Sequence, residues 1–308
     1  MFSVIIPYYK KRNYIQRCLD SVLSQTFQDF EIILVDDGSQ DHIAELIVTK
    51  YAGKLKLIQQ QNQGVSVARN RGISESTMNY IALLDADDCW HHRYLEYCYE
   101  VIKQNSNVKI IGTSYLSDIE LLDEKVENLH YYKIKNYFST KHIRNLIFLT
   151  SATILKKDFF KQNTGFNPKF KRGEDIDVWF RVMISEGQAF HIVNKLVYYS
   201  NEDMDQLTRQ ITPIEVSVLS SMFDLYKPLF IKYRNESFEK FINKWTLFQL
   251  IKYYDNINWE GAKITFDSRT RSLILYDFPF MFPLAILKTE IFKKIVKNYF
   301  KILIKFGL

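Results

Sequence analysis

Short apolar runs alternate with amphipathic stretches through the first two hundred residues of the chain. Four of these runs have the length and composition of buried strands: Ser3–Ile6, Glu31–Val35, Leu55–Ile58 and Ile81–Leu84. The stretches between them place apolar residues at helical spacing, as Ile15, Leu19 and Val22 do. Because alternating strands and helices join through right-handed crossovers, the pattern predicts an α/β fold whose mostly parallel, doubly wound sheet carries helices on both faces.

The pattern changes at about residue 201. Beyond it, apolar residues follow helical spacing over long segments with no strand-like run between them. One such face is formed by Val216, Leu219 and Phe223, and another by Phe238, Ile242 and Trp245. We therefore predict an α/β domain at residues 1–205 and a helical C-terminal region at residues 206–308.

Three carboxylates, Asp85, Asp87 and Asp88, directly follow the fourth strand. Ligands bind at the carboxyl ends of parallel strands, and Tyr9 and Asp37 follow two other strands at that same edge. Carboxylates this close repel one another unless a cation neutralises them, which favours a site for Mg²⁺ or Mn²⁺. The alternative is that Asp85 only ends the strand and that Asp87 and Asp88 cap the next helix.

Composition narrows the class of protein. The formal net charge of +6 is modest for 308 residues and acidic residues are plentiful, so a nucleic-acid partner is not expected. Cys18, Cys89 and Cys98 lack the spacing of a zinc site or of a disulfide framework. The N-terminus has no basic segment typical of a signal peptide, and the apolar residues 278–287 fall short of the ~20 that span a membrane. These features predict a cytoplasmic protein.

Five motifs resemble those of the inverting family-2 glycosyltransferases, which have a GT-A fold. They occur in the family's order and at its usual spacing, and the resemblance covers roughly residues 2–200. The matching segments are Ser3–Pro7 with Tyr9, Ser24–Phe27 before Glu31–Ser39, Asn62–Gly64 with Ala68–Asn70 and Gly72, Leu84–Asp88, and Gly173–Asp175 with Trp179 and Arg181.

The resemblance implies a set of residues that bind the nucleotide of a UDP-sugar. Asp37 matches the family's uracil reader, and a fixed carboxylate acceptor suits the N3–H donor of uracil. Pro7 and Tyr9 lie where the family builds a wall against the base. Arg69 stands where the family places a basic group, although an exposed helix charge remains an alternative for it. Asp37 has the alternative role of a polar turn that feeds a helix.

The resemblance also implies a divalent cation, Mn²⁺ or Mg²⁺, and a general base. Asp87 matches the family's metal carboxylate, and Asp85 helps to hold the metal or the donor ribose. An inverting transfer needs a carboxylate that takes the proton of the acceptor hydroxyl, and Asp175 matches that base, beside Glu174. The alternative for Asp175 is a helix N-cap ahead of Ile176, and one aspartate can do both.

The chain departs from the family pattern in three places. Lys10 stands where asparagine is frequent, and the usual Arg-x-His segment after the last core strand reads Tyr198–Glu202 instead. This change puts diphosphate contacts from that loop in doubt, and Arg209 is a conceivable substitute. The Gln-x-x-Arg-Trp motif of processive synthases is also missing, which favours the transfer of a single sugar.

Lysines recur on one side of the last predicted helix, residues 288–306. Lys293, Lys297, Lys301 and Lys305 follow every fourth residue, while Ile291, Ile295, Tyr299, Ile302 and Phe306 occupy a different face. A basic amphipathic helix suits an anionic membrane surface, which predicts peripheral attachment to the inner face of the cell membrane. The alternative is a helix packed on the domain with a solvated lysine edge.

Together these features predict a glycosyltransferase that moves one hexose or N-acetylhexosamine from a UDP-sugar to a hydroxyl. The expected acceptor is a saccharide or glycolipid, such as a precursor of lipopolysaccharide or capsule. A catalytically inactive nucleotide-sugar-binding or scaffold protein is one rival. A sugar-nucleotide nucleotidyltransferase is another, but residues 7–13 lack the Gly-rich phosphate loop that it needs.

Overall fold

The computed structural model describes residues 1–139, 147–185, 187–202, 216–254, 286 and 289–306. Its contacts divide the chain into two compact units. The first contains Met1–Lys135, Ile147–Pro168 and Asp177–Gln206, and the second contains Asn136–Leu146, Lys169–Ile176 and Leu207–Leu308. The predicted division of the chain after residue 205 stays a prediction.

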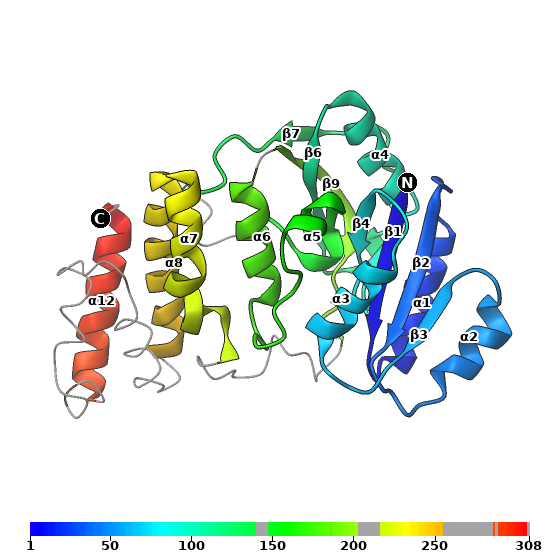
Figure 1. The fold of residues 1–308 in the computed structure, drawn as a ribbon, viewed down its shortest axis with the longest axis horizontal. Helices are drawn as coiled ribbons and strands as arrows, with labels where there is room; N and C mark the ends of the chain where they lie inside the picture. Colours follow the sequence, from blue (N-terminus) through cyan, green and yellow to red (C-terminus); the bar gives the residue numbers. More distant parts are fainter. Residues whose placement is uncertain (140–146, 186, 203–215, 255–285, 287–288, 307–308) are drawn as a thin grey trace. The chain divides into compact units, whose positions relative to one another are not determined.

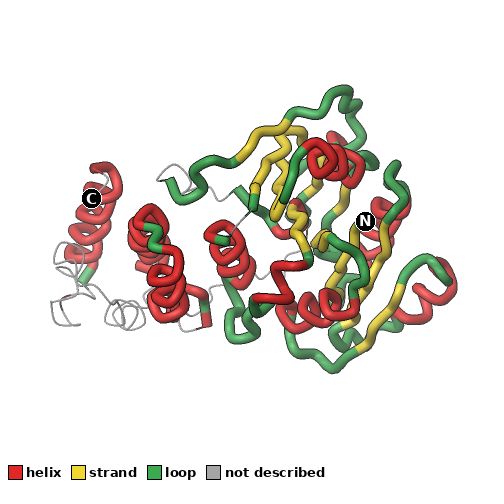
Figure 2. Tube along the Cα trace, turned by 45° about the horizontal axis from the view of Figure 1, so that its top comes forward, coloured by secondary structure: helices red, strands yellow, loops and turns green. Residues whose placement is uncertain are grey.

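The first unit begins with a parallel half-sheet in which each crossover is a helix. The strands are β1 (Phe2–Tyr8), β2 (Phe30–Asp36), β3 (Lys56–Gln59) and β4 (Tyr80–Leu83), and the helices are α1 (Arg12–Leu23), α2 (Ile43–Tyr51) and α3 (Val65–Glu75). The strands pair in the order β3-β2-β1-β4, and Figure 1 labels them. Figure 2 shows strands of the sheet flanked by helices. All seven residues of β1 are buried, as expected of a strand with neighbours on both sides and helices on both faces.

The sheet continues beyond β4 with strands of mixed direction. The further elements are β5 (Cys89–Trp90), α4 (Tyr94–Gln104), β6 (Val108–Leu116), η1 (Ile119–Leu121), β7 (Tyr131–Lys133), η3 (Thr150–Ala152), β8 (Thr153–Lys156), α5 (Asp158–Gln162), α6 (Glu174–Ile184) and β9 (Gln188–Tyr198). Strand β8 runs antiparallel between β4 and β6, whereas β6 and β9 are parallel. The predicted α/β fold class is confirmed, and the sheet is parallel apart from β5, β7 and β8.

Two packing contacts fix the helices on the parallel half-sheet. On one face, Ile15, Leu19 and Val22 of α1 are fully buried in a cluster that also contains residues of α4. On the other face, α3 packs on β1 and β2 through Gly72. A Cβ at position 72 would lie 2.4 Å from Cγ2 of Ile5, so the absence of a side chain lets the helix approach the strand.

The second unit is helical, as predicted for the C-terminal region. Its elements after residue 215 are η6 (Val218–Ser221), α7 (Met222–Tyr233), α8 (Glu236–Tyr254) and α12 (Glu290–Phe306), and α8 contacts both α7 and α12 (Figure 1). Its core is aromatic, with the rings of Phe138 and Phe238 4.5 Å apart and Trp245 buried. The described residues contain no helix with the length and hydropathy needed to span a bilayer, and residues 278–287 lie almost wholly outside them.

Helix α12 confirms the predicted C-terminal helix and shows how it is turned. Val296 is buried, whereas Ile291, Ile295 and Ile302 are 76%, 57% and 52% exposed. Residues spaced by four and seven share one face of a helix, so these isoleucines form a single exposed stripe. Lys294, next to the stripe, is also exposed. Lys288, the predicted start of this helix, lies outside the described residues.

We predict that Gly72→Ala lowers the free energy of unfolding by about 1–3 kcal/mol, because the added methyl group must displace Ile5 in a close-packed core. Urea denaturation followed by circular dichroism measures the change. Ser74→Ala, at an exposed position of the same helix, is the control and is expected to stay within about 0.5 kcal/mol of the wild type. A Gly72→Ala variant as stable as this control would contradict the packing argument.

Candidate active site

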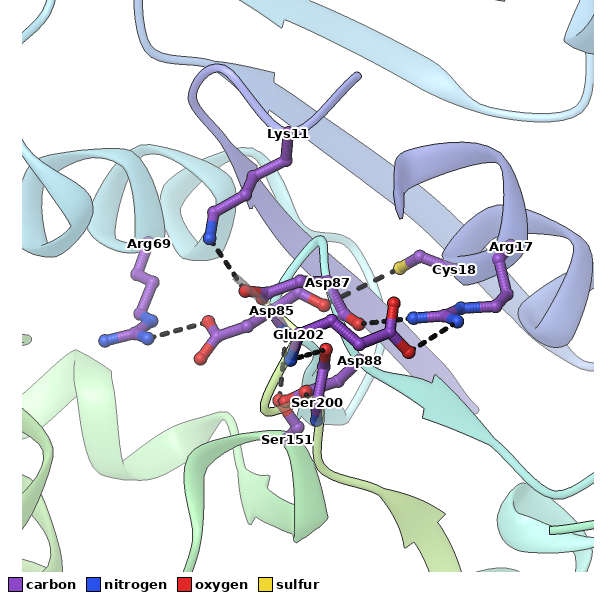
Figure 3. Close-up of polar contacts among 10 residues, drawn as sticks. All are labelled: Lys11, Arg17, Cys18, Arg69, Asp85, Asp87, Asp88, Ser151, Ser200 and Glu202. Atoms are coloured by element: carbon purple, nitrogen blue, oxygen red, sulfur yellow. Dashed lines mark hydrogen bonds and ion pairs between the residues drawn. The ribbon is translucent and has the colours of Figure 1, made fainter. Parts of the chain in front are cut away.

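The acid loop, residues 85–88, forms a tight turn directly after β4. The backbone N–H of Asp88 donates to the carbonyl oxygen of Asp85 at 3.0 Å, which places the three aspartates on one turn. Asp87 and Asp88 are buried, and the side chain of Asp85 is 30% exposed. Figure 3 shows Lys11, Arg17 and Arg69 pointing toward this loop from separate segments of the chain.

Asp88 anchors the acid loop to two other segments. Its Oδ1 accepts the backbone N–H of Ser200 at 2.8 Å, and its Oδ2 accepts the hydroxyl of Ser151. The same hydroxyl oxygen accepts the N–H of Asp85 at 3.0 Å. Burial, and then the charges of Asp85 and Asp87, raise the pKa of Asp88 well above its ordinary value. Because both oxygens bind the protein, Asp88 acts as a structural residue here.

Asp85 forms an ion pair with Arg69 of helix α3. Nη2 of Arg69 lies 2.7 Å from Oδ1 of Asp85, and the guanidinium lies 5.2 Å from the centre of the Phe166 ring. Arg69 is 3% exposed, so the alternative of a solvated helix charge is wrong. The structure thus brings together two residues that the motifs predicted, Arg69 and Asp85.

Asp87 forms an ion pair with Lys11, a residue that sequence reasoning missed. Nζ of Lys11 lies 2.7 Å from Oδ2 of Asp87, and the two side chains are 23% and 10% exposed. Lys11 lies in the loop between β1 and α1. The sequence held a signal for it, since residues 10–12 are three successive bases in the loop after a strand that ends at the same edge of the sheet.

A third basic residue, Arg17 of α1, holds the segment that follows β9. Nη1 of Arg17 lies 3.0 Å from Oε1 of Glu202, and the hydroxyl of Tyr198 donates to that oxygen at 2.6 Å. The hydrogen bond from Tyr198, and to a smaller extent the contact with Arg17, hold the pKa of Glu202 below its usual value. Nη2 of Arg17 also approaches the carbonyl oxygen of Asp87 at 3.5 Å. The segment that replaces the Arg-x-His motif is therefore tied to the acid loop, and Arg209 lies outside the described residues.

The loop after β1 presents the predicted base wall. Pro7 is part of β1, which continues to Tyr8, two residues beyond the predicted end. Pairing with β4 ends at Ile5, so the missing N–H of Pro7 breaks no bond to that strand. Tyr9 is 41% exposed, and Nζ of Lys10 lies 5.1 Å from the centre of its ring. An aromatic ring thus remains accessible next to the strand end.

Asp37 holds the loop that leads into α3. Its Oδ1 accepts the N–H of Gln63 at 2.9 Å and Nε2 of Gln60 at 2.8 Å, and its Oδ2 accepts the N–H of Gly64 at 2.8 Å. A carboxylate offers about four acceptor sites, so three donors leave room for one more. Asp37, which is 3% exposed, is thus a structural anchor with one acceptor position left.

Glu174 and Asp175 open helix α6, and both belong to the second unit. Gly173 before them has a φ of +78°, a conformation that suits glycine, and a Cβ there would lie 2.6 Å from Val218. Oδ1 of Asp175 accepts the N–H of Ile176 at 2.8 Å. Burial, with a smaller effect from the charge of Asp175, raises the pKa of Tyr137. Asp175 is half-buried.

The acid loop offers carboxylate ligands for a hard divalent cation, but fewer than a complete site made by the protein alone would need. Within the described residues, no three His, Cys, Asp or Glu side chains are grouped so that they could share a metal ion. Mg²⁺ in sites that bind phosphates commonly takes only one or two carboxylates and completes its shell with water and substrate oxygens. Asp87 and Asp85 could supply that smaller set of oxygen ligands, whereas Asp88 is committed to Ser151 and Ser200.

Other motif residues brace the structure around the acid loop. Nε2 of Gln25 donates to the carbonyl oxygen of His91 at 2.9 Å, and its Oε1 accepts the N–H of Leu95 at 2.9 Å, which joins the end of α1 to the start of α4. Asn70 of α3 makes two hydrogen bonds to the backbone of Phe166, at 2.7 and 2.8 Å. These polar groups are buried or half-buried with their partners satisfied, which makes the frame specific.

Comparison with known proteins also indicates a glycosyltransferase. The model of the family "Glycosyl transferase family 2" matches residues 3–163. An uncharacterized glycosyltransferase of Rickettsia felis is 29% identical over 192 residues, which cover 59% of this chain and 31% of that protein. Chondroitin synthase of Pasteurella multocida is 29% identical over 210 residues, which cover 64% of this chain and 20% of that protein. The chain thus spans less than two thirds of the length of these curated relatives.

Solved structures share the fold. S. aureus TarS 1–349 in complex with UDP-GlcNAc superimposes with a TM-score of 0.69 at 16% identity, over 99% of this chain and 90% of that chain. The complex of the same protein with UDP gives a TM-score of 0.64 at 18% identity, over 99% of this chain and 88% of that chain. At this identity the likeness shows the fold alone, and it confirms the predicted GT-A architecture.

We predict that Asp37→Asn lowers the free energy of unfolding by about 1–3 kcal/mol, because an amide NH₂ cannot accept the N–H groups that meet one of the carboxylate oxygens. Thermal and urea denaturation measure the loss. Asp123→Asn, at an exposed position, is the matched control and is expected to be nearly neutral. Equal stability of the two variants would show that Asp37 does not hold the loop before α3.

Proposed function

The chain belongs to glycosyl transferase family 2, and we propose that it transfers one hexose or N-acetylhexosamine from a UDP-sugar to a hydroxyl of a lipid-linked or growing surface glycan. The observation that carries the proposal is the meeting of Asp85 and Asp87 with the bases Arg69 and Lys11 at one sheet edge. Acids and bases interleaved in this way suit a diphosphate that arrives with a cation. Precursors of lipopolysaccharide or capsule are the acceptors we propose.

The proposed donor site uses the loops after β1 and β2. The exposed ring of Tyr9, beside Pro7, offers a stacking surface for uracil, since every base has a π-face. The remaining acceptor site of Asp37 suits the N3–H of uracil and would reject cytosine, whose N3 is an acceptor. The shared fold with TarS, solved with UDP-GlcNAc, supports a UDP-sugar as the donor class.

The proposed mechanism is a single displacement with inversion. The acceptor oxygen forms a bond to the anomeric carbon on the face opposite the diphosphate, the bond from that carbon to the diphosphate oxygen breaks, and its electron pair leaves with UDP. Asp175, next to Glu174, takes the proton of the acceptor hydroxyl. Asp87 and Asp85 would hold Mn²⁺ or Mg²⁺, and such an ion supplies Lewis-acid stabilisation of the departing diphosphate.

A peripheral position on the inner face of the cell membrane is part of the proposal. The exposed stripe of Ile291, Ile295 and Ile302 provides an apolar surface, and the exposed Lys294 and Lys301 provide positive charge beside it. Apolar area together with attraction to anionic lipids is what holds an interfacial helix on a bilayer. A lipid-linked acceptor would be found at the same surface.

Calorimetric titration of UDP with and without Mn²⁺, with CDP and GDP as comparisons, tests the donor site. We expect Asp87→Ala to lose metal-dependent UDP binding, because it removes a ligand of the ion.

We expect Asp175→Asn to lose more than about 100-fold in transfer rate while UDP binding stays near that of the wild type, because only proton removal is affected. UDP binding by a wild type that never transfers a sugar would favour the inactive scaffold, and substantial transfer by Asp175→Asn would refute the base assignment.

We also predict that the protein sediments with phosphatidylglycerol vesicles and not with phosphatidylcholine vesicles, and that salt releases it. Lys294→Gln and Lys301→Gln should each weaken binding about fivefold, since a lysine near the surface contributes about 1 kcal/mol. Lys240→Gln, on the exposed side of α8, is the control. Absence of binding to phosphatidylglycerol at low salt would exclude this attachment.

A further inference from the structure

The two ion pairs of the acid loop differ in how firmly their bases are held. Arg69 has a side chain that is 4% exposed, and its guanidinium lies against the ring of Phe166. Lys11 has a side chain that is 23% exposed and comes from a loop. A buried, stacked guanidinium is fixed in place, whereas a lysine ammonium on a flexible four-carbon stem can change partners. The pair with Asp85 is therefore the more firmly held of the two, and the pair with Asp87 is the one more able to exchange.

The ammonium of Lys11 occupies the carboxylate proposed to hold the metal. Its Nζ lies 2.7 Å from Oδ2 of Asp87, which is closer than a second cation on the same oxygen would tolerate. A divalent ion that binds this oxygen must therefore displace Lys11. In the absence of nucleotide, the metal gains Oδ2 of Asp87 by breaking an existing ion pair, and this competition weakens its binding.

A diphosphate gives the displaced ammonium a new partner. The segment Tyr198–Glu202 has no basic residue, and its Glu202 is paired with Arg17. Lysine is a common phosphate ligand that acts as a point charge. We infer that Lys11 exchanges Asp87 for the diphosphate when metal and donor bind together, an inference that rests on the proposed UDP-sugar site. Metal and nucleotide then bind cooperatively. The diphosphate gives Lys11 a new partner and so frees Asp87 for the metal, and the metal releases Lys11 from Asp87 and so frees it for the diphosphate.

The experiment measures the affinity of Mn²⁺ alone, of Mn²⁺ with saturating UDP, and of UDP with saturating Mn²⁺, by calorimetry. In the wild type, we expect UDP to tighten Mn²⁺ binding at least about tenfold. In Lys11→Met, Mn²⁺ alone should bind about fivefold to tenfold more tightly and UDP should bind about tenfold more weakly. The coupling between them should fall by a similar factor, to the part that comes from direct contact between the ion and the diphosphate. Lys11→Gln serves as a second neutral variant, and Lys11→Arg should retain the coupling because it keeps the charge.

Lys56 provides the matched control for loss of a lysine–carboxylate pair. It lies 2.7 Å from Glu75, at the amino end of β3, and Lys56→Met should behave like the wild type in all three titrations. The exchange is overturned if both neutral Lys11 variants bind Mn²⁺ alone no more tightly than the wild type does. If the wild type still shows metal-dependent UDP binding in that case, the proposed function stands. Absence of UDP binding to the wild type at every Mn²⁺ concentration overturns both.

Discussion

Mutual repulsion among three carboxylates within four residues is the constraint on which this edge of the sheet depends. Two unit charges 4 Å apart interact by about 4 kcal/mol at the effective dielectric constant near a protein surface, so the acids cannot be left uncompensated. Each acid is accommodated differently: Arg69 pairs with Asp85, Lys11 pairs with Asp87, and Ser151 and Ser200 bind Asp88. Segments far apart in the chain are thereby drawn to one turn.

The motif residues divide into two physical groups. Asp37, Asp85 and Asp87 are carboxylates that follow the carboxyl ends of parallel strands, the edge at which α/β sheets bind ligands. Gln25 and Asn70 instead satisfy backbone groups of neighbouring segments and hold the frame in register. Asp37 belongs to both groups, since it anchors the loop before α3 and retains an acceptor site. A motif match therefore indicates geometry as much as chemistry, and single residues within it need their contacts to be known before a role is assigned.

The alternation of strands and helices was readable because hydrophobic periodicity is a local property. The edge shared by Asp37, Asp85 and Asp87 followed from it, since parallel strands end on the same side. The direction of β8 was not readable, because a short apolar run has the same composition in either direction. Lys11 was missed and the burial of Arg69 left open because ion pairs form between residues brought together by the tertiary fold, not by sequence spacing. The position of α12's exposed face likewise depends on what packs against it.

The antiparallel pairing of β8 with β4 has a consequence for synthesis. Strand β4 pairs with β1 on one side as soon as Leu83 has emerged, but its other side stays open until Thr153 opposite Leu83 has been made. At the usual rate of about 5–20 residues per second, that interval lasts several seconds. Throughout it, the nascent chain exposes an apolar strand edge able to pair with another chain. Synthesis of this protein therefore passes through an interval, between the completion of β4 and the arrival of β8, in which an unpaired apolar edge is open to other chains.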